Sequence, residues 1–248
     1  MENINNTYFT LVAGGNGLIG KAIVKELIKT RNVISLDNKI ITFKHKNLIN
    51  FKLDITDKKS IENFFKMISK KKILIHSFIN CSYPRTKDWG TKFENLKFES
   101  INRNFSYQIG SLIYFLKFII SHYLSNNIKG KIILFSSIQG VSAPKFHHYD
   151  GTDMSSPIEY SAIKSGIISL VKYLAKYYKN KNLNINCISP GGLKTNQPKK
   201  FIYKYKKATI NKGLLDPNDV VGITDFLLSD KSKYINGQNI IIDDGWTL

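Results

Sequence analysis

The segment "LVAGGNGLIGKAI", residues 11–23, joins an apolar run, a glycine-rich turn and the start of an amphipathic helix. Its glycines Gly14, Gly17 and Gly20 have the spacing G-x-x-G-x-x-G, which permits a tight turn and lets backbone N–H groups approach an anion closely. A strand before such a turn and a helix after it are typical of a dinucleotide site, whereas a glycine turn alone also occurs as a plain connection. The segment predicts the first strand-helix unit of a nucleotide-binding sheet.

The rest of the chain repeats this alternation of short β-branched runs and helix-length segments. Most of the runs are continuously apolar, which is typical of parallel strands that are covered on both faces. The predicted strands are "YFTLVAG" (8–14), "NVISLD" (32–37), "INFKLD" (49–54), "KILIHSFIN" (72–80), "KIILFSS" (131–137), "LNINCIS" (183–189) and "NIIID" (239–243). Helical patterns cover about residues 18–30, 58–70, 96–125, 158–179 and 217–229. The order predicts an α/β fold: a Rossmann-type doubly wound, seven-stranded, mainly parallel sheet with helices on both faces and its ligand crevice at the carboxyl ends of the strands.

Composition favours one domain over residues 1–248. The chain is 42% hydrophobic and has no internal repeat, low-complexity block or Pro/Gly/Ser-rich linker. Its formal charge of +19 is large, but Lys, Asn and Ile are abundant throughout, so a sequence-wide bias explains the charge better than a nucleic-acid site does.

The cysteines and the apolar segments indicate in which cellular compartment the protein is expected. Cys81 and Cys187 are too few and too isolated for a disulfide framework or a zinc site, so no metal is expected. The N-terminus lacks the pattern of a signal peptide. The most apolar helix candidate, residues 111–124, is short for a membrane span and carries Lys117. We therefore expect a cytoplasmic protein without a membrane partner.

Asp37 closes the second predicted strand, seventeen residues after Gly20. A carboxylate at this point accepts hydrogen bonds from the adenosine ribose hydroxyls and repels a 2′-phosphate. We therefore expect NAD as the cofactor. The nearby Lys39 leaves NADP open, and a solvated Asp at a strand end is the alternative interpretation.

Tyr160 and Lys164 lie in a helical pattern at an i, i+4 spacing, which places them on one helix face. An ammonium beside the phenol favours the phenolate and predicts a lowered pKa for Tyr160, as suits a proton donor and acceptor. Ser136 and Ser137 end the fifth predicted strand, at the crevice. These groups predict acid/base chemistry near the nucleotide.

These motifs resemble the short-chain dehydrogenase/reductase family over essentially the whole chain. Further matches are "LDITD" (53–57), "INCSYP" (79–84), "NCISPGG" (186–192) and "NGQNIIIDDG" (236–245). The resemblance implies that Ser137 polarises the substrate oxygen, Tyr160 transfers the proton, and Lys164 holds the nicotinamide ribose and tunes Tyr160. It also implies the cofactor-binding set Gly14, Asn16, Gly17, Leu18, Ile19, Gly20, Asp37, Asp54, Ile55, Asn80, Cys81, Ser82, Tyr160, Lys164, Pro190, Gly191 and Leu193.

The chain also departs from the family pattern. Cys81, Ser82 and Tyr83 stand where the family usually has Asn-Ala-Gly, and the fourth catalytic residue of many relatives has two candidates here, Asn102 and Asn104. Longer segments resemble the flagellin-modification oxidoreductases, a bacterial subgroup associated with nonulosonic sugars of surface glycans. That resemblance implies a sugar substrate.

Two segments predict the substrate side. Ser137 and Tyr160 are twenty-three residues apart, against some thirteen in most relatives, and the added loop contains the substrate-binding candidates Lys145, His147, His148 and Tyr149 together with Asp150, Thr152 and Asp153. Residues 190–213 form a predicted lid, in which seven lysines from Lys194 to Lys212 occur without an acidic residue. An anionic sugar would be attracted to this segment, but lysines that merely face water explain it as well.

The leading prediction is an NAD(H)-dependent oxidoreductase that interconverts a secondary alcohol and a ketone on an anionic sugar: a sugar phosphate, a nucleotide sugar or a nonulosonate. The alternatives are a non-catalytic dinucleotide-binding or scaffold protein and, more remotely, a nucleic-acid-binding protein that stacks bases on Tyr203 and Tyr205. The resemblance further implies a homodimer or homotetramer, formed through the helices near 96–125 and 158–179.

Overall fold

The computed structural model describes residues 8–248 and contains a seven-stranded parallel sheet. The strand order is β3-β2-β1-β4-β5-β6-β7, which is the doubly wound arrangement that the sequence predicts. The strands are β1 (Tyr8–Ala13), β2 (Asn32–Asp37), β3 (Leu48–Lys52), β4 (Leu74–Asn80), β5 (Lys131–Phe135), β6 (Asn184–Pro190) and β7 (Asn239–Ile242).

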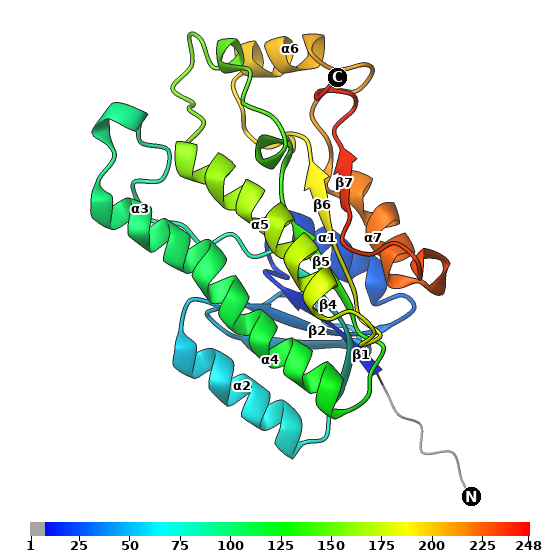
Figure 1. Ribbon diagram of the computed structural model, residues 1–248. Helices are drawn as coiled ribbons and strands as arrows, with labels where there is room; N and C mark the ends of the chain where they lie inside the picture. The colour runs from blue at the N-terminus through cyan, green and yellow to red at the C-terminus, as the bar shows by residue number, and fades with distance from the viewer. Residues whose placement is uncertain (1–7) are drawn as a thin grey trace, which may run out of the picture.

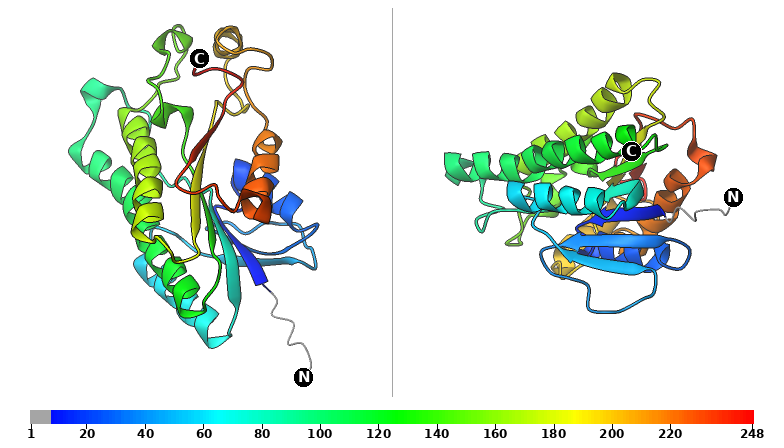
Figure 2. Two further views of the ribbon diagram at one scale, coloured as in Figure 1. Left: turned by 45° about the vertical axis from the view of Figure 1, so that its right-hand side comes forward. Right: turned by 90° about the horizontal axis from the view of Figure 1, so that it is seen from below.

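Helices cover both faces of this sheet (Figure 1, Figure 2). Helices α2 (Lys58–Lys70), α4 (Ser111–Ser125) and α5 (Ile158–Tyr177) lie on one face, and α1 (Leu18–Leu27) and α7 (Val221–Leu228) lie on the other. Helix α3 (Phe98–Phe105) precedes α4, and α6 (Lys199–Lys207) lies beyond the carboxyl ends of the strands. Short 3-10 turns span Phe93–Asn95, Ile138–Gly140, Phe146–His148, Pro217–Val220 and Asp230–Ser232.

Two helical features differ from the prediction. The pattern at 96–125 is interrupted, because a π-helical turn at Ser106–Gly110 joins α3 to α4. Helix α6 was not predicted as a helix at all, since its lysines obscure the apolar positions. Phe201 and Tyr205, four residues apart, are nonetheless both buried.

The core forms two layers because successive strand residues point to opposite faces of the sheet. Leu11 and Ala13 pack with α2, α4 and α5, while Val12 between them packs with α1 and α7. A third, smaller cluster contains Ile138, Phe201, Tyr205, Leu214 and Trp246 and lies under α6. Across residues 8–248, no helix combines the length and apolarity that crossing a bilayer requires.

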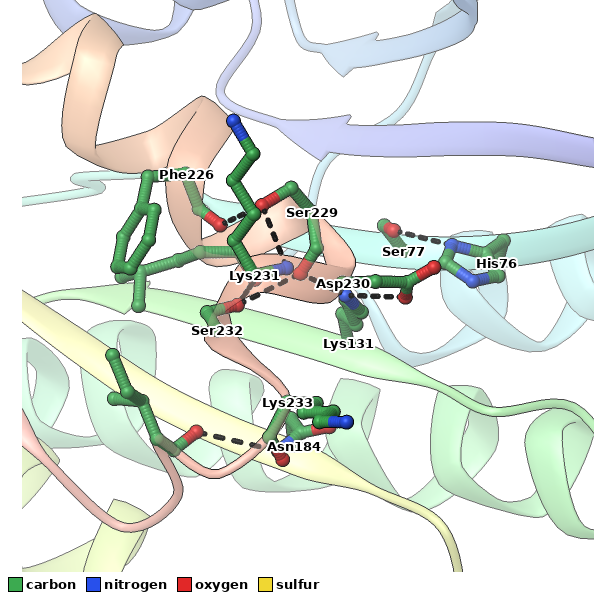
Figure 3. Close-up of polar contacts among 12 residues, drawn as sticks. His76, Ser77, Lys131, Asn184, Phe226, Ser229, Asp230, Lys231, Ser232 and Lys233 are labelled. Carbon is green, nitrogen blue, oxygen red and sulfur yellow. Dashed lines mark hydrogen bonds and ion pairs between the residues drawn. The ribbon is translucent and has the colours of Figure 1, made fainter.

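The opposite end of the sheet, where the strands begin, contains a buried charge. Lys131, the first residue of β5, is 4% exposed. Its ammonium donates to the Ser229 carbonyl and lies 3.4 Å from the exposed carboxylate of Asp230 (Figure 3). This contact fastens the turn after α7 to the start of β5.

Candidate active site

A cavity of about 680 Å³ lies at the carboxyl ends of the strands. Its walls come from the segments that follow β1, β2, β3, β4, β5 and β6, with Tyr160 and Lys164 of α5 added from one side. This is the switch-point position where doubly wound sheets bind their ligands. The lining residues are Ala13, Gly14, Gly17, Leu18, Ile19, Leu36, Asp37, Asn38, Leu53, Asp54, Ile55, Cys81, Ser82, Tyr83, Pro84, Arg85, Phe135, Ser136, Ser137, Tyr160, Lys164, Pro190, Gly191 and Thr195.

The glycine turn at one end of the cavity requires its glycines for different reasons. Gly14 has φ +73°, and a Cβ on it would lie 2.6 Å from the Ser82 backbone nitrogen. A Cβ on Gly20 would lie 2.1 Å from the Gly14 carbonyl oxygen, so Gly20 lets α1 approach the turn. Gly17 lines the cavity at the N-terminus of α1, and a Cβ there would meet only the Gly14 oxygen, at 3.2 Å. The cavity therefore opens onto free helix N–H groups.

Acidic side chains follow β2 and β3 at the same end. The Asp37 carboxylate accepts hydrogen bonds from the backbone N–H groups of Asn16 and Lys39, both at 3.0 Å, and so ties the glycine turn to β2. Asp54 lines the cavity and accepts the backbone and hydroxyl hydrogen bonds of Thr56. These two carboxylates make this end of the cavity negative.

Ser137, Tyr160 and Lys164 meet at the other end of the cavity because α5 packs closely against the segment after β5. The Lys164 ammonium donates to the Phe135 carbonyl at 2.9 Å, and the Ser136 hydroxyl donates to the Lys164 carbonyl at 2.8 Å. A Cβ on Gly140 would lie 2.6 Å from the Lys164 backbone, so only glycine permits this approach.

Burial governs the protonation of this group. It lowers the pKa of Lys164 to about 8. Burial also raises the pKa of Tyr160, and the side-chain hydrogen bond from Ser137 offsets only part of the rise. The sequence-based expectation that Lys164 lowers the Tyr160 pKa is wrong in this structure. The Lys164 ammonium bonds to the Phe135 carbonyl and lies 5.5 Å from the centre of the tyrosine ring, so it does not offset the burial.

Aromatic rings enclose Tyr160 on the side of the segment after β4. The Tyr83 ring packs edge-on at 5.6 Å from Tyr160, and Trp89 contacts both rings at 5.7 and 6.2 Å. The Arg85 guanidinium lies 5.2 Å from the centre of the Tyr83 ring. Tyr83 and Arg85 line the cavity, so this unusual segment forms part of the wall next to Tyr160.

Of the two asparagine candidates, Asn104 faces this segment. It is 1% exposed, and its side-chain oxygen accepts the backbone N–H of Thr86 at 3.0 Å, whereas Asn102 is exposed. The Asn104 amide nitrogen is buried without a hydrogen-bond partner in the described part of the chain.

Four predicted cofactor contacts do not line the cavity: Asn16, Gly20, Asn80 and Leu193. Three of them support residues that do. The Asn16 backbone N–H donates to the Asp37 carboxylate, and Gly20 allows the first turn of α1 to pack on the glycine turn. The Asn80 side-chain oxygen accepts a hydrogen bond from the Ser82 hydroxyl at 2.6 Å. Leu193 forms an isolated bridge with Leu215. The other thirteen of the seventeen predicted cofactor contacts line the cavity.

The four predicted substrate contacts lie in or beside the cluster under α6, outside the cavity lining. His148 is 1% exposed among Phe201, Tyr205 and Trp246. Lys145 donates to the Trp246 carbonyl, Tyr149 packs on Phe201, and His147 is exposed. Within residues 8–248, His, Cys, Asp and Glu side chains form no group of three suited to a metal ion. The four residues lie away from the cavity because their loop packs against the aromatic side chains of α6 and Trp246.

The lysine-rich segment is partly committed to internal contacts. Lys204 donates to the carbonyls of His147 and Asp150, and Lys212 pairs with the carboxylates of Asp216 and Asp219. The Tyr205 hydroxyl accepts the Gly192 N–H at 2.6 Å. Of the predicted lid, Pro190, Gly191 and Thr195 line the cavity.

Sequence reasoning missed several wall residues, among them Pro84, Arg85, Phe135 and Thr195. The signal was present for Phe135, because the last residue of a parallel strand lies at the ligand edge of the sheet. Pro84 and Arg85 lie four and five residues beyond the end of β4, so the rule does not decide where their side chains lie. Thr195 depends on the path of a loop and carries no such signal.

Comparison with known proteins gives consistent matches. Residues 31–247 match the family described as enoyl-(acyl carrier protein) reductase. The post-translational flagellin modification protein A of Campylobacter coli is 37% identical over 96% of this chain and 97% of its own. A 3-oxoacyl-(acyl-carrier-protein) reductase of Buchnera aphidicola is 28% identical, over 95% of both chains.

A solved structure with the same fold is the short chain dehydrogenase from Leptospira borgpetersenii, which was crystallised with bound NAD+. It superposes with a TM-score of 0.90 at 30% identity, over 100% of this chain and 97% of its own. The likeness therefore extends along both chains and includes the segments that form the cavity.

Proposed function

Because the chain belongs to the short-chain dehydrogenase/reductase family, we propose that it is an NAD(H)-dependent oxidoreductase that interconverts a secondary alcohol and a ketone on an anionic sugar. The observation that carries the proposal is one cavity that holds the glycine turn at one end and Ser137, Tyr160 and Lys164 at the other. Flagellin modification protein A, at 37% identity, supports a sugar of a surface-glycan pathway as the substrate.

The residues present fit a nicotinamide dinucleotide. The glycine turn leaves room beside the N-terminus of α1, where a pyrophosphate would be held by free N–H groups. Asp37 and Asp54 would contact the adenosine, with Asp37 favouring NAD over NADP because its charge repels a 2′-phosphate. Pro190 and Gly191 would border the nicotinamide. When bound, such a cofactor supplies or accepts the hydride.

The protein's own groups would manage the proton. For reduction of a ketone, the Ser137 hydroxyl would hydrogen-bond to the carbonyl oxygen and orient it, while the Tyr160 hydroxyl donates its proton to that oxygen. Burial keeps Tyr160 in the neutral, donating form, since it raises the pKa of the phenol. Lys164 would hydrogen-bond to the ribose of the cofactor, and its ammonium would supply a positive charge beside Tyr160.

Asn104 has a positioning role in this scheme. Its side chain fixes the backbone of Thr86 and so the segment that carries Tyr83 and Arg85. It is therefore the better candidate of the two for the fourth residue of the site, because Asn102 faces solvent.

Association into a homodimer or homotetramer is also proposed. Apolar side chains on the outer faces of α4 and α5 support it, since Ile113 is 47% exposed and Tyr173 and Tyr177 are 62% and 66% exposed. Light scattering of the purified protein is expected to give two or four times the mass of 28.3 kDa, and a monomer mass would contradict the proposal.

The test of the function is turnover against a panel of phosphorylated, nucleotide-linked and nonulosonic sugars, followed as NADH oxidation and NAD reduction. We expect at least one member to react with NADH and to react more slowly with NADPH. Measurable NADH binding without turnover of any sugar would favour a non-catalytic dinucleotide-binding protein. A strong preference for NADPH would overturn the role of Asp37.

A further inference from the structure

The charges that line the cavity are separated by sign. Asp37 and Asp54 lie at the glycine-turn end, and the basic lining residues in the described part of the chain are Lys164 and Arg85 at the other end. Lys164 is 7% exposed and donates to the Phe135 carbonyl, so it is already committed to the site described above. Arg85 is the basic side chain whose charge that site does not use.

The lysine-rich segment does not supply a competing cation in the cavity wall. None of its seven lysines is among the residues that line the cavity in the described part of the chain, residues 8–248. Lys204 and Lys212 are held by carbonyls and carboxylates of the chain itself. These lysines can raise the local potential, but they are not part of the cavity wall that holds Arg85 and Lys164.

Arg85 is exposed and held in place without an acidic partner. Its guanidinium lies 5.2 Å from the centre of the Tyr83 ring and contacts the Tyr83 hydroxyl, which orients the group and uses only part of its N–H donors. Over residues 8–248, no carboxylate lies within 4.0 Å of it; the ion pairs of this part of the chain involve other cations. A guanidinium oriented in this way, with donors left over, matches the two oxygens of a phosphate or carboxylate group.

The Tyr83 ring connects this guanidinium to the reaction centre. One side of Tyr83 packs on Tyr160 at 5.6 Å, and Trp89 contacts both rings. A sugar whose reacting carbon lies at the Tyr160 hydroxyl would thus extend along the aromatic wall toward Arg85. The centre of the Tyr83 ring lies 5.6 Å from the centre of the Tyr160 ring and 5.2 Å from the Arg85 guanidinium, so the Tyr83 ring stands between the two groups along the wall.

We propose that Arg85 binds the oxyanion of the substrate and that Tyr83 and Trp89 form the wall for its sugar ring. Arg85 is then the residue that selects anionic over neutral sugars, in place of the lysine-rich segment, for which the sequence left anion binding and plain solvent exposure equally open. The oxyanion is a phosphate ester or a carboxylate, because a guanidinium recognises both by paired hydrogen bonds. The inference rests on the proposed function only for the placement of the reacting carbon at Tyr160.

Calorimetric titration tests the binding claim separately from turnover. The protein carries Tyr160→Phe, so that no reaction heat intervenes, and is saturated with NAD. The probes are glucose 6-phosphate for the phosphate, N-acetylneuraminate for the carboxylate and glucose as the neutral sugar. Each is titrated into this background and into the same background with Arg85→Gln, Arg85→Lys or Arg103→Gln. Arg103 is an exposed arginine of α3 outside the cavity lining and serves as the matched control.

We expect one of the two anionic probes to bind more tightly than glucose and to lose at least about tenfold in affinity in Arg85→Gln, which is the effect of losing a charge-assisted hydrogen bond. Arg85→Lys should recover part of the loss, and Arg103→Gln should match the background. Equal affinity in Arg85→Gln, or no preference for either anion over glucose, would overturn the proposal.

Two outcomes distinguish oxyanion binding by Arg85 from cofactor binding and from the proposed reaction. If Arg85→Gln weakens NADH binding as much as sugar binding, the side chain holds the cofactor and the proposal is wrong. If the anionic probe binds through Arg85 while no sugar of the turnover panel reacts, the oxyanion site stands and the proposed reaction fails.

Discussion

His148 shows how a polar residue of the substrate-side loop became part of a core. Its ring is 1% exposed and packs against Phe201, Tyr205 and Trp246, and its Nε2 atom is buried without a hydrogen-bond partner in the described chain. Burial, with smaller contributions from the neighbouring basic groups of His147, Lys145 and Lys204, lowers the pKa of His148 to about 4.

This burial predicts an acid-sensitive fold. Unfolded His148 takes up a proton near pH 6.5, whereas the folded ring resists protonation down to about pH 4. Its contribution to stability is therefore complete above pH 6.5 and is lost as the pH falls from 6.5 to 4, by about 1–3 kcal/mol. Urea unfolding measured along this range should show the loss in the wild type.

His148→Phe should flatten that part of the curve, because phenylalanine fills the same space without a proton to bind. His147→Ala, a change at the exposed neighbour, should retain the slope. A His148→Phe protein with the wild-type slope would show that His76 and His122, whose pKa values burial also lowers, are responsible instead.

Single residues were predictable from sequence when local spacing decided their place. Tyr160 and Lys164 share a helix face by their i, i+4 spacing, and Ser137 follows a strand, so all three reach the cavity as expected. His148 and Arg85 could not be assigned in this way. Whether a loop side chain turns into an aromatic cluster or into a cavity depends on what packs beside it, and the partners lie in α6 and after β4.

At the scale of elements, the glycine turn and α1 form one unit in which two glycines do different work. Gly20 allows the helix to pack on the turn, since a Cβ would lie 2.1 Å from the Gly14 carbonyl oxygen. Gly17 leaves the cavity wall open at the helix N-terminus.

Alanine at each position should separate folding from binding. Gly20→Ala forces the backbone apart and is expected to cost about 1–3 kcal/mol of unfolding free energy. Gly17→Ala should change stability by less than about 1 kcal/mol, yet weaken NADH binding at least tenfold, because its methyl group would enter the space proposed for the pyrophosphate. Thermal unfolding and NADH titration of both variants check this. Full NADH affinity in Gly17→Ala would place the pyrophosphate elsewhere.

Strands and helices were predicted correctly where one sequence pattern was clear, and helix α6 was missed because two patterns overlap in its sequence. The strands were visible because parallel strands covered on both faces are continuously apolar. Helix α6 was hidden, since the lysines of "KKFIYKYKK" suggested a charged loop while Phe201 and Tyr205 carried the helical spacing. The π-helical turn at Ser106–Gly110 left no sequence signal that distinguishes it from an α-helix.

At the scale of the whole molecule, the sheet has a functional end and a structural end. The cavity lies where the strands finish, and Lys131 fastens the turn after α7 at the end where they begin (Figure 3). The sequence predicted the functional end from the general rule for doubly wound sheets, but not the structural end, because a lysine at the start of an apolar strand is usually solvated.

Lys131 should accordingly affect stability without affecting the site. Lys131→Ala removes the buried aliphatic stem and the ammonium's hydrogen bond to the Ser229 carbonyl, which keeps its hydrogen bonds from Ser232, and this is expected to cost about 2–3 kcal/mol. Lys131→Met keeps most of the stem and should cost less. Denaturant unfolding gives the stabilities, and NADH affinity at 25 °C, expected to be unchanged in both, is the control. A loss of NADH affinity would show that the two ends are coupled.

In the proposed reaction, Tyr160 exchanges a proton with the substrate oxygen beside the bound cofactor. The most direct measurement of this role compares Tyr160→Phe with the wild type, both for NADH affinity and for turnover of a sugar identified by the panel. We expect Tyr160→Phe to bind NADH within about twofold of the wild-type affinity and to turn over more slowly by about a factor of 10²–10⁴, the usual contribution of a positioned acid. Wild-type turnover in Tyr160→Phe would contradict this role.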